Sequence, residues 1–275
     1  MLIPFPGAFA QDQLGETIHW AYSAYFGTGR YELDNGDSTY VLGGRPRKLI
    51  REPTIGEQGE RSAGIELFFP IAVGVYDFDP TNIGGTARVD NVGTVSIVPG
   101  AAFEMRLDGR WSLKPFVHVG WGAEIDGDAS AWLYWAGLKT QARFSAESFD
   151  WMLVNGLAYL GYSNDTGEDG NLLSVLTAFE FERPSRYEIA GHQVRLHWHV
   201  AYTDYLNELK IAPRLIGTDA VQIDDEWEIG AAFSTGEHRL GIKRLRWDRV
   251  GIAYRFSSNG DFEGIGLTFT SLFDR

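Results

Sequence analysis

The 275-residue chain lacks cysteine, long apolar runs and an excess of basic residues. Without cysteine it can form neither a disulfide framework nor a thiolate metal site. No stretch approaches eighteen consecutive apolar residues, which excludes a helical membrane span. The 24 Lys and Arg against 37 Asp and Glu leave a net charge of −13. Because phosphate neutralisation needs a basic face, this balance argues against a nucleic-acid partner.

Aromatic residues and glycine are abundant instead. The chain holds 17 Phe, 12 Tyr and 9 Trp, and its 33 Gly outnumber its 10 Pro. A large aromatic load is typical of proteins whose strands carry aromatic girdles at the two membrane interfaces. This composition favours many strands and turns over disorder.

The last residues of the chain alternate between apolar and small or polar side chains. Successive side chains of a strand point to opposite faces, so residues 262–273 predict a strand with one apolar face. The pattern, which places an aromatic residue near the end, is typical of the C-terminal assembly strand of bacterial outer-membrane β-barrels. The apolar face consists of Ile265, Leu267, Phe269 and Phe273.

About twelve segments with this two-residue period follow one another, an even number, as single-chain bacterial barrels require. The sequence thus predicts an all-β fold, a transmembrane antiparallel up-and-down β-barrel of about twelve strands. The first strand is expected near Thr17–Gly29, with Ile18, Trp20, Tyr22, Ala24 and Phe26 on one face. The segment Trp151–Tyr162 is apolar at both odd- and even-numbered positions, so the sequence does not predict which of its side chains face the lipid. Bends are expected at Pro70, Pro99 and Pro115, since proline cannot donate to a strand ladder.

Charged residues and histidines occupy the parity opposite the apolar face, which predicts that they point into the barrel lumen. Both signs are present, so these side chains can pair across the lumen and narrow it, whereas a lumen of one sign would favour a selective channel. Unpaired buried charge is costly. The candidate pore-lining residues are Glu66, Glu104, Lys114, His118, Glu124, Lys139, Arg143, Glu180, Glu182, Arg195, His197, His199, Glu228 and Arg255.

The N-terminal residues indicate export. Ala8-Phe9-Ala10 before Gln11 has the small-x-small form of a secretory cleavage site. We therefore expect residues 1–10 to be the remnant of a signal peptide and residues 11–275 to form one barrel domain. With an even strand count both termini should lie on the same side, the periplasm, with the long acidic connections outside.

Catalytic and metal chemistry find little support in the sequence. His197 and His199 stand two residues apart on one face, yet a metal site needs three or four ligands and no third is placed by sequence. A Ser nucleophile needs a base within hydrogen-bond reach, and none of the 6 His is followed by Ser two residues on. We predict no catalytic residue, no metal and no cofactor.

Four stretches carry a family resemblance that extends over nearly the whole chain after the leader. They resemble the solitary outer-membrane autotransporter-like β-barrel family, which implies a translocator-type barrel without a passenger domain. The match departs from the usual pattern in that Asp274 and Arg275 follow the terminal aromatic residue. The family implies architecture and no particular activity. The stretches are Trp20–Gly29, Pro115–Gly122, Asp224–Gly230 and Gly251–Phe262.

These observations predict an integral outer-membrane envelope or binding protein of unassigned ligand, with a narrow, charge-paired lumen. A small porin-like diffusion channel is the alternative, and an outer-membrane lipid hydrolase is a more distant one. The expected partners are outer-membrane lipid and lipopolysaccharide, together with the machinery that assembles outer-membrane barrels. No nucleic acid is expected among them.

Overall fold

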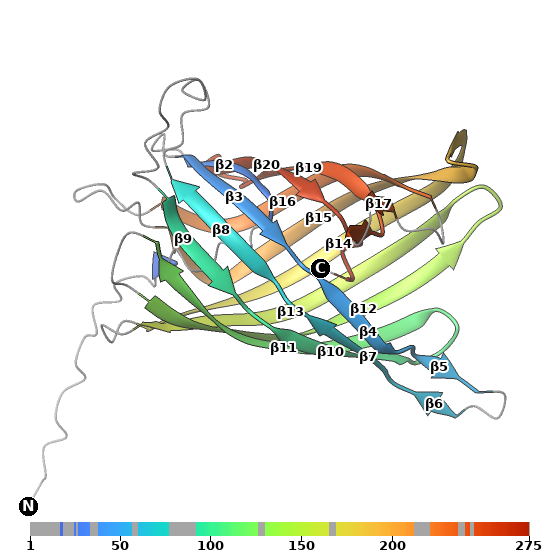
Figure 1. The fold of residues 1–275 in the computed structure, drawn as a ribbon, viewed down its shortest axis with the longest axis horizontal. Coiled ribbons are helices and arrows are strands. Elements are labelled where there is room, and N and C mark those ends of the chain that lie inside the picture. The colour runs from blue at the N-terminus through green and yellow to red at the C-terminus, as the bar shows by residue number, and fades with distance from the viewer. Residues whose placement is uncertain are drawn as a thin grey trace, which may run out of the picture.

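The computed structural model is a closed antiparallel barrel of twelve strands, as the sequence predicts (Figure 1). No helix among the described residues is long and apolar enough to cross a membrane. The first ten residues, where the signal remnant is predicted, lie outside the described part. The structure describes residues 17–18, 25, 27–33, 38–56, 60–76, 92–125, 130–164, 169–211, 221–235, 240–242 and 245–274.

Four of the barrel strands are short or interrupted. The first is β2 (Gly29–Leu33), and the second consists of β3 (Ser38–Gly44) and β4 (Arg47–Arg51). The third and fourth are formed by β7 (Gly64–Phe68), β8 (Ile71–Tyr76), β9 (Val92–Ile97) and β10 (Gly100–Arg106).

The other barrel strands are continuous, and the last of them pairs with β2 to complete the circle. They are β11 (Trp111–Glu124), β12 (Ser130–Ser145), β13 (Asp150–Asn164), β14 (Asp169–Ile189), β15 (His192–Ile211), β16 (Val221–Ser234), β19 (Val250–Phe256) and β20 (Phe262–Thr268). Small strands outside this circle are β1 (Thr17–Ile18), β5 (Thr54–Ile55), β6 (Arg61–Ser62), β17 (Leu240–Ile242) and β18 (Leu245–Trp247).

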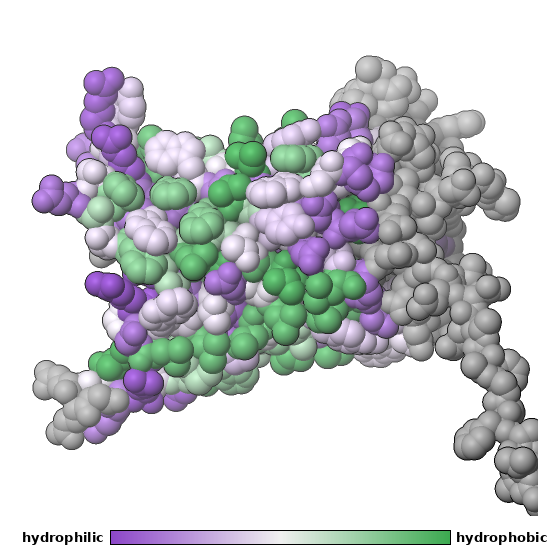
Figure 2. All heavy atoms as spheres, turned by 180° about the vertical axis from the view of Figure 1, so that it is seen from behind, coloured by the Kyte–Doolittle hydropathy of each residue, from purple (hydrophilic) through white to green (hydrophobic). Residues whose placement is uncertain are grey.

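The alternation of side chains along each strand sorts them between the outside and the lumen. In β11, Val117, Val119 and Trp121 are exposed on the outer surface, whereas Lys114 and His118 are buried inside. Figure 2 shows the apolar side chains gathered in a band across the middle of the barrel wall, with hydrophilic residues toward its ends. This band is what a hydrocarbon layer requires of a barrel.

The prolines interrupt the strands where the sequence predicts bends. Pro70 separates β7 from β8 and Pro99 separates β9 from β10. The sheet closes over these breaks, because Val98 N donates to Pro70 O at 2.9 Å and Val119 N donates to Pro99 O at 3.0 Å. Pro115 remains inside β11, where the pairing with β10 has a gap between Ala102↔Phe116 and Met105↔Leu113 without a change of register.

The connections define two different ends of the barrel. At one end, which we call the turn end, strands are joined by short turns at residues 107–110, 146–149 and 190–191 and by the β5–β6 and β17–β18 hairpins. At the other, the loop end, the connections 34–37, 77–91, 126–129, 165–168 and 212–220 lie outside the described residues, and 257–261 is a tight turn. The strands β15 and β16 pair out to Ile211 and Val221 at this end.

The two ends of the described chain differ from the sequence prediction. Thr17 and Ile18 are not part of the first barrel strand, but pair in parallel with Lys210 and Ile211 at the loop end. Tyr25 has helical backbone, and the first strand begins only at Gly29. The last strand ends at the turn end, and residues 1–16 lie outside the described part, so the periplasmic placement of both termini stays a prediction.

Candidate functional site in the barrel lumen

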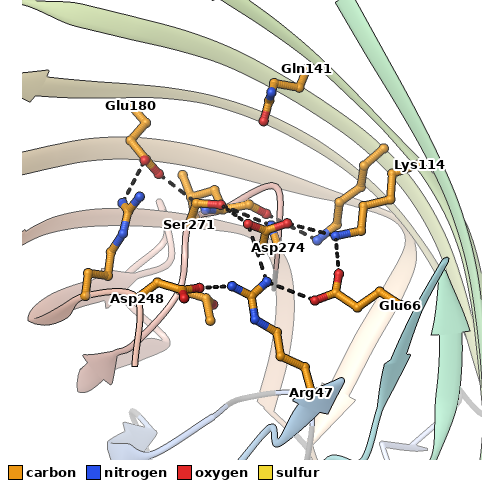
Figure 3. A network of polar contacts seen from close by, with 12 residues as sticks. Arg47, Glu66, Lys114, Gln141, Glu180, Asp248, Ser271 and Asp274 are labelled. Atoms are coloured by element: carbon orange, nitrogen blue, oxygen red, sulfur yellow. Dashed lines mark hydrogen bonds and ion pairs between the residues drawn. The ribbon is translucent and has the colours of Figure 1, made fainter. Parts of the chain in front are cut away.

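A network of alternating charges crosses the lumen at the turn end (Figure 3). Lys114 Nζ lies 2.9 Å from Glu66 Oε2 and 2.8 Å from Asp274 Oδ1. Arg47 Nη1 lies 3.1 Å from Glu66 Oε1 and 3.6 Å from Asp274 Oδ2, and Arg47 Nη2 pairs with Asp248. Two cations thus meet three carboxylates, so each charge taken from water has an opposite partner.

The chain's last described residues enter the lumen and form part of this network. In this C-terminal tail (residues 271–274), Leu272 and Phe273 are 3% and 1% exposed. Leu272 N donates to Glu180 Oε2 at 3.3 Å, and Lys139 Nζ donates to Leu272 O at 3.2 Å. The tail packs on a cluster formed by Met152, Val154, Ala178 and Ala201, with Leu176 beside it.

The prediction that the C-terminal strand extends to Phe273 is wrong in this structure. Ile265 and Leu267 do face outward, at 60% and 47% exposure, but β20 ends at Thr268. Phe269 follows the strand and stacks on Trp247. The chain then turns inward, where Phe273 loses its contact with water and the Asp274 carboxylate meets Lys114 and Arg47.

A second charged cluster lies on the inner faces of β15, β16 and β19. His199 Nε2 lies 2.6 Å from Glu228 Oε1, whose other oxygen lies 2.8 Å from Arg255 Nε. Arg255 Nη1 is 3.6 Å from Glu226 Oε1, and Tyr205 OH donates to Glu226 Oε2 at 3.3 Å. These contacts tie three neighbouring strands together across the inside of the wall.

His197 forms a contact that sequence spacing missed. Its Nε2 lies 2.8 Å from Ser234 Oγ on the neighbouring strand, and its Nδ1 lies 3.8 Å from Glu182 Oε2. Glu182 in turn pairs with Arg195, which also contacts Asp150 at 3.2 Å. A serine hydroxyl beside a histidine is the first requirement for nucleophilic catalysis. Both side chains are buried, however, and neither lines the described cavity, so the pair acts as polar filling of the wall, in which His197 Nδ1 has no hydrogen-bond partner among the described residues.

A cavity of about 10 Å³ lies next to His118, room for about one water molecule. His118 accepts or donates a hydrogen bond at 3.2 Å to Val98 O and contacts the rings of Phe116 and Trp135. The cavity is lined by Arg45, Phe68, Ala102, Lys114, Phe116, His118, Lys139 and Phe273.

The structure places every predicted pore-lining residue on the inward parity of its strand, with different degrees of burial. Arg143, predicted to pair across the lumen, is exposed near the turn end and contacts Gln141 of its own strand at 3.4 Å. The buried members are Glu66, Lys114, His118, Glu180, His197, His199 and Glu228. The half-buried members are Glu104, Glu124, Lys139, Glu182, Arg195 and Arg255.

Several residues of the lumen were not among those predicted. Arg249 Nη1 lies 2.7 Å from Glu180 Oε1, and Arg47, Asp248 and Asp274 belong to the network at the turn end. Arg47 follows Pro46 at the basic end of its strand, and the other three lie outside the main strands. The two-residue period indicates which side chains point into the lumen only within a strand. No sequence signal therefore marked the residues that lie beyond the strand ends.

The fold defines a class of protein. The chain has the fold of an outer-membrane β-barrel of the autotransporter translocator type. It is similar to the β domain of the Bordetella autotransporter BrkA, with a TM-score of 0.52 and 14% identity over 89% of this chain and 96% of that one. It is also similar to the translocator domain of autotransporter NalP from Neisseria meningitidis, with a TM-score of 0.51 and 12% identity over 87% and 82% of the two chains.

No protein-family model matches the sequence, and no curated protein matches it significantly. The family resemblance seen in the sequence is thus confirmed at the level of the fold.

Proposed function

We propose that the chain is an integral outer-membrane barrel of the translocator type whose lumen is closed at rest. The observation that carries this proposal is the tail inside the barrel, where Asp274 pairs with Lys114 and Phe273 is buried. A solute needs a continuous water path, and here apolar side chains and charge pairs fill the turn end. We assign no ligand to the barrel.

The outer surface supports placement in a membrane. An apolar band with hydrophilic ends suits insertion among outer-membrane lipids and lipopolysaccharide, which we propose as its surroundings (Figure 2). We also propose that the machinery assembling outer-membrane barrels inserts it. The short turns would face the periplasm and the loop end the cell surface, following the general rule for such barrels.

A small diffusion channel is the second candidate. It is favoured by the polar and charged side chains on the inner faces of the strands, which would line a passage if the tail moved aside. In the described arrangement the buried tail and its ion pair with Lys114 lie in the lumen, so steady conduction is not expected.

Cysteine labelling tests the location and the orientation, because the chain has no cysteine of its own. Asn259→Cys places a thiol in the exposed turn at the loop end, and Ser148→Cys places a matched thiol in an exposed turn at the other end. On intact cells a membrane-impermeant maleimide should label only the first variant, and permeabilised cells should allow both. Labelling of Ser148→Cys on intact cells, or recovery of the chain outside the membrane fraction, would contradict the proposal.

A further inference from the structure

A row of aromatic rings runs across the outer surface of the barrel near its turn end. Its rings stand opposite one another on neighbouring strands, in the pairs Phe144↔Trp151, Trp151↔Phe181 and Phe181↔Trp198. The first pair stacks with ring centroids 4.1 Å apart, and Phe181 and Trp198 are 40% and 43% exposed. We call these residues the aromatic row. Rings in this position mark the boundary between the hydrocarbon and the headgroups of a membrane.

Three arginines, which we call the turn-end arginines, lie just beyond this row on the side of the turns. Arg110 precedes β11, and its guanidinium carbon lies 5.9 Å from the centre of the Phe144 ring. Arg183 is exposed and follows Phe181 by two residues, so its side chain leaves the same face of β14. Arg186, further along this hairpin, lies 5.4 Å from the centre of the tyrosine ring that follows it. Positive charge therefore stands where the rings meet water.

None of the turn-end arginines forms an ion pair with a carboxylate among the described residues. In the lumen, by contrast, Arg47 and Lys114 each contact carboxylates. The nearby Asp108 accepts instead from the backbone N–H groups of Arg110 and Trp111, both at 2.7 Å. Carboxylates are not scarce, since the chain has 37 Asp and Glu against 24 Lys and Arg. The turn-end arginines thus present their charge to a partner outside the chain.

The described outer rim of the loop end has the opposite charge. Asp204 and Asp225 stand opposite each other on β15 and β16, and Glu263 is exposed on β20. Arg30 of β2 lies at the same end, but it pairs with Glu32. Anionic headgroups are therefore attracted at the turn end and repelled at the loop end.

A guanidinium beside aromatic rings suits the chemistry of a phospholipid. Its planar fork of N–H donors matches two oxygens of a phosphate group, and stacking on a ring leaves these in-plane donors free. The acyl chains of the same lipid can lie against the apolar band below the aromatic row. One lipid molecule can thus contact both features at once.

We propose that the aromatic row and the turn-end arginines bind phospholipids with anionic headgroups, in the membrane leaflet next to the turn end. A headgroup that carries an amine as well as a phosphate is held less tightly, because the arginines repel the amine. The proposal rests on the proposed function in placing the barrel in a membrane, and it adds the class of lipid and the surface that binds it.

Spin-labelled lipids test the proposal in bilayers that contain the purified full chain. Lipid in contact with a membrane protein gives a motionally restricted component in the spectrum. This component should be larger for labelled phosphatidylglycerol than for labelled phosphatidylethanolamine, and the difference should shrink as salt rises. Arg110→Gln and Arg183→Gln should each reduce the difference, and the double variant should lose most of it.

Arg106→Gln is the matched control. Arg106 is exposed at the other end of the same turn as Arg110, but it pairs with Ser112, which is buried inside the barrel, so its side chain leaves the inner face. This variant should keep the wild-type preference for phosphatidylglycerol. An equal loss in Arg106→Gln and Arg183→Gln would overturn the proposal, because net charge alone would then explain the preference.

A wild-type barrel that restricts both labelled lipids equally would also overturn the lipid site, while leaving the barrel in its membrane. The absence of any restricted component would contradict the proposed function itself, and the lipid site with it. The spectrum thus separates failure of the lipid site from failure of the membrane placement.

Discussion

Lys114 Nζ and Asp274 Oδ1 lie 2.8 Å apart, although 160 residues separate them in the chain. The first belongs to β11 near the turn end of the barrel, and the second belongs to the C-terminal tail. This ion pair therefore attaches the end of the chain to the inside of the barrel. Through this contact, whether the lumen is closed depends on the position of the tail.

Replacing Lys114 should loosen the turn end of the lumen. Lys114→Met removes the shared partner of Glu66 and Asp274 and leaves buried carboxylate charge less compensated. Breaking a buried pair in this way costs about 3–5 kcal/mol. The temperature at which the folded barrel converts to the unfolded form on a gel should fall. Lys48→Met, an exposed lysine on β4, is the control and should leave this temperature unchanged.

The cost of placing a charge on the outer surface of the barrel should depend on how deep the residue lies in the membrane. Val119 is exposed in the middle of β11, so Val119→Arg should cost about 2–4 kcal/mol if it lies at the bilayer midplane. Leu107→Arg, in the exposed turn at the end of the barrel, should cost almost nothing. The folded fraction in outer membranes measures the difference. Equal yields for the two variants would show that the outer band does not face lipid.

The attachment of the tail should depend on pH. Burial by itself raises the pKa of Asp274, but the nearby charges of Lys114 and Arg47 hold the pKa well below the ordinary value of 3.8. A carboxyl with a lowered pKa contributes stability in full above its ordinary pKa and loses it as pH falls further. The tail should thus stay attached at pH 5 and be released only below about 3.8.

Bilayer recordings across this pH range, with Asp274→Asn as the control, measure this release. The wild-type current should rise only under strongly acidic conditions. The variant, which lacks the carboxylate, should already be leaky at neutral pH and should lack this transition. A wild-type current that rises between pH 7 and 5 would contradict the assignment to Asp274.

The barrel could be predicted from the sequence because alternation is a local property of each strand. The inward facing of Glu228, Arg255 and His199 follows from their neighbours alone. The fate of Phe273 could not be predicted in this way, because the alternating pattern continues beyond Thr268, where the strand ends.

One ambiguity of the sequence has a structural cause. Residues of β13 are apolar on both parities, which left the facing of this strand open. Met152 and Val154 point inward and pack against Leu272 and Phe273. The inner face of β13 is apolar there because it contacts the tail rather than water. The apolar residues on both faces of this strand thus coincide with the place where the tail packs.

Single-channel recording of the purified barrel in planar bilayers tests the closed lumen most directly. Wild-type protein is compared with a variant that ends at Thr270 and keeps the whole of β20, with a folded barrel verified by heat-modifiability for both. The wild type should be closed for most of the time, and the shortened barrel should conduct steadily. A wide and steadily open wild-type pore, or a shortened barrel no leakier than the wild type, would contradict closure of the lumen by the C-terminal tail.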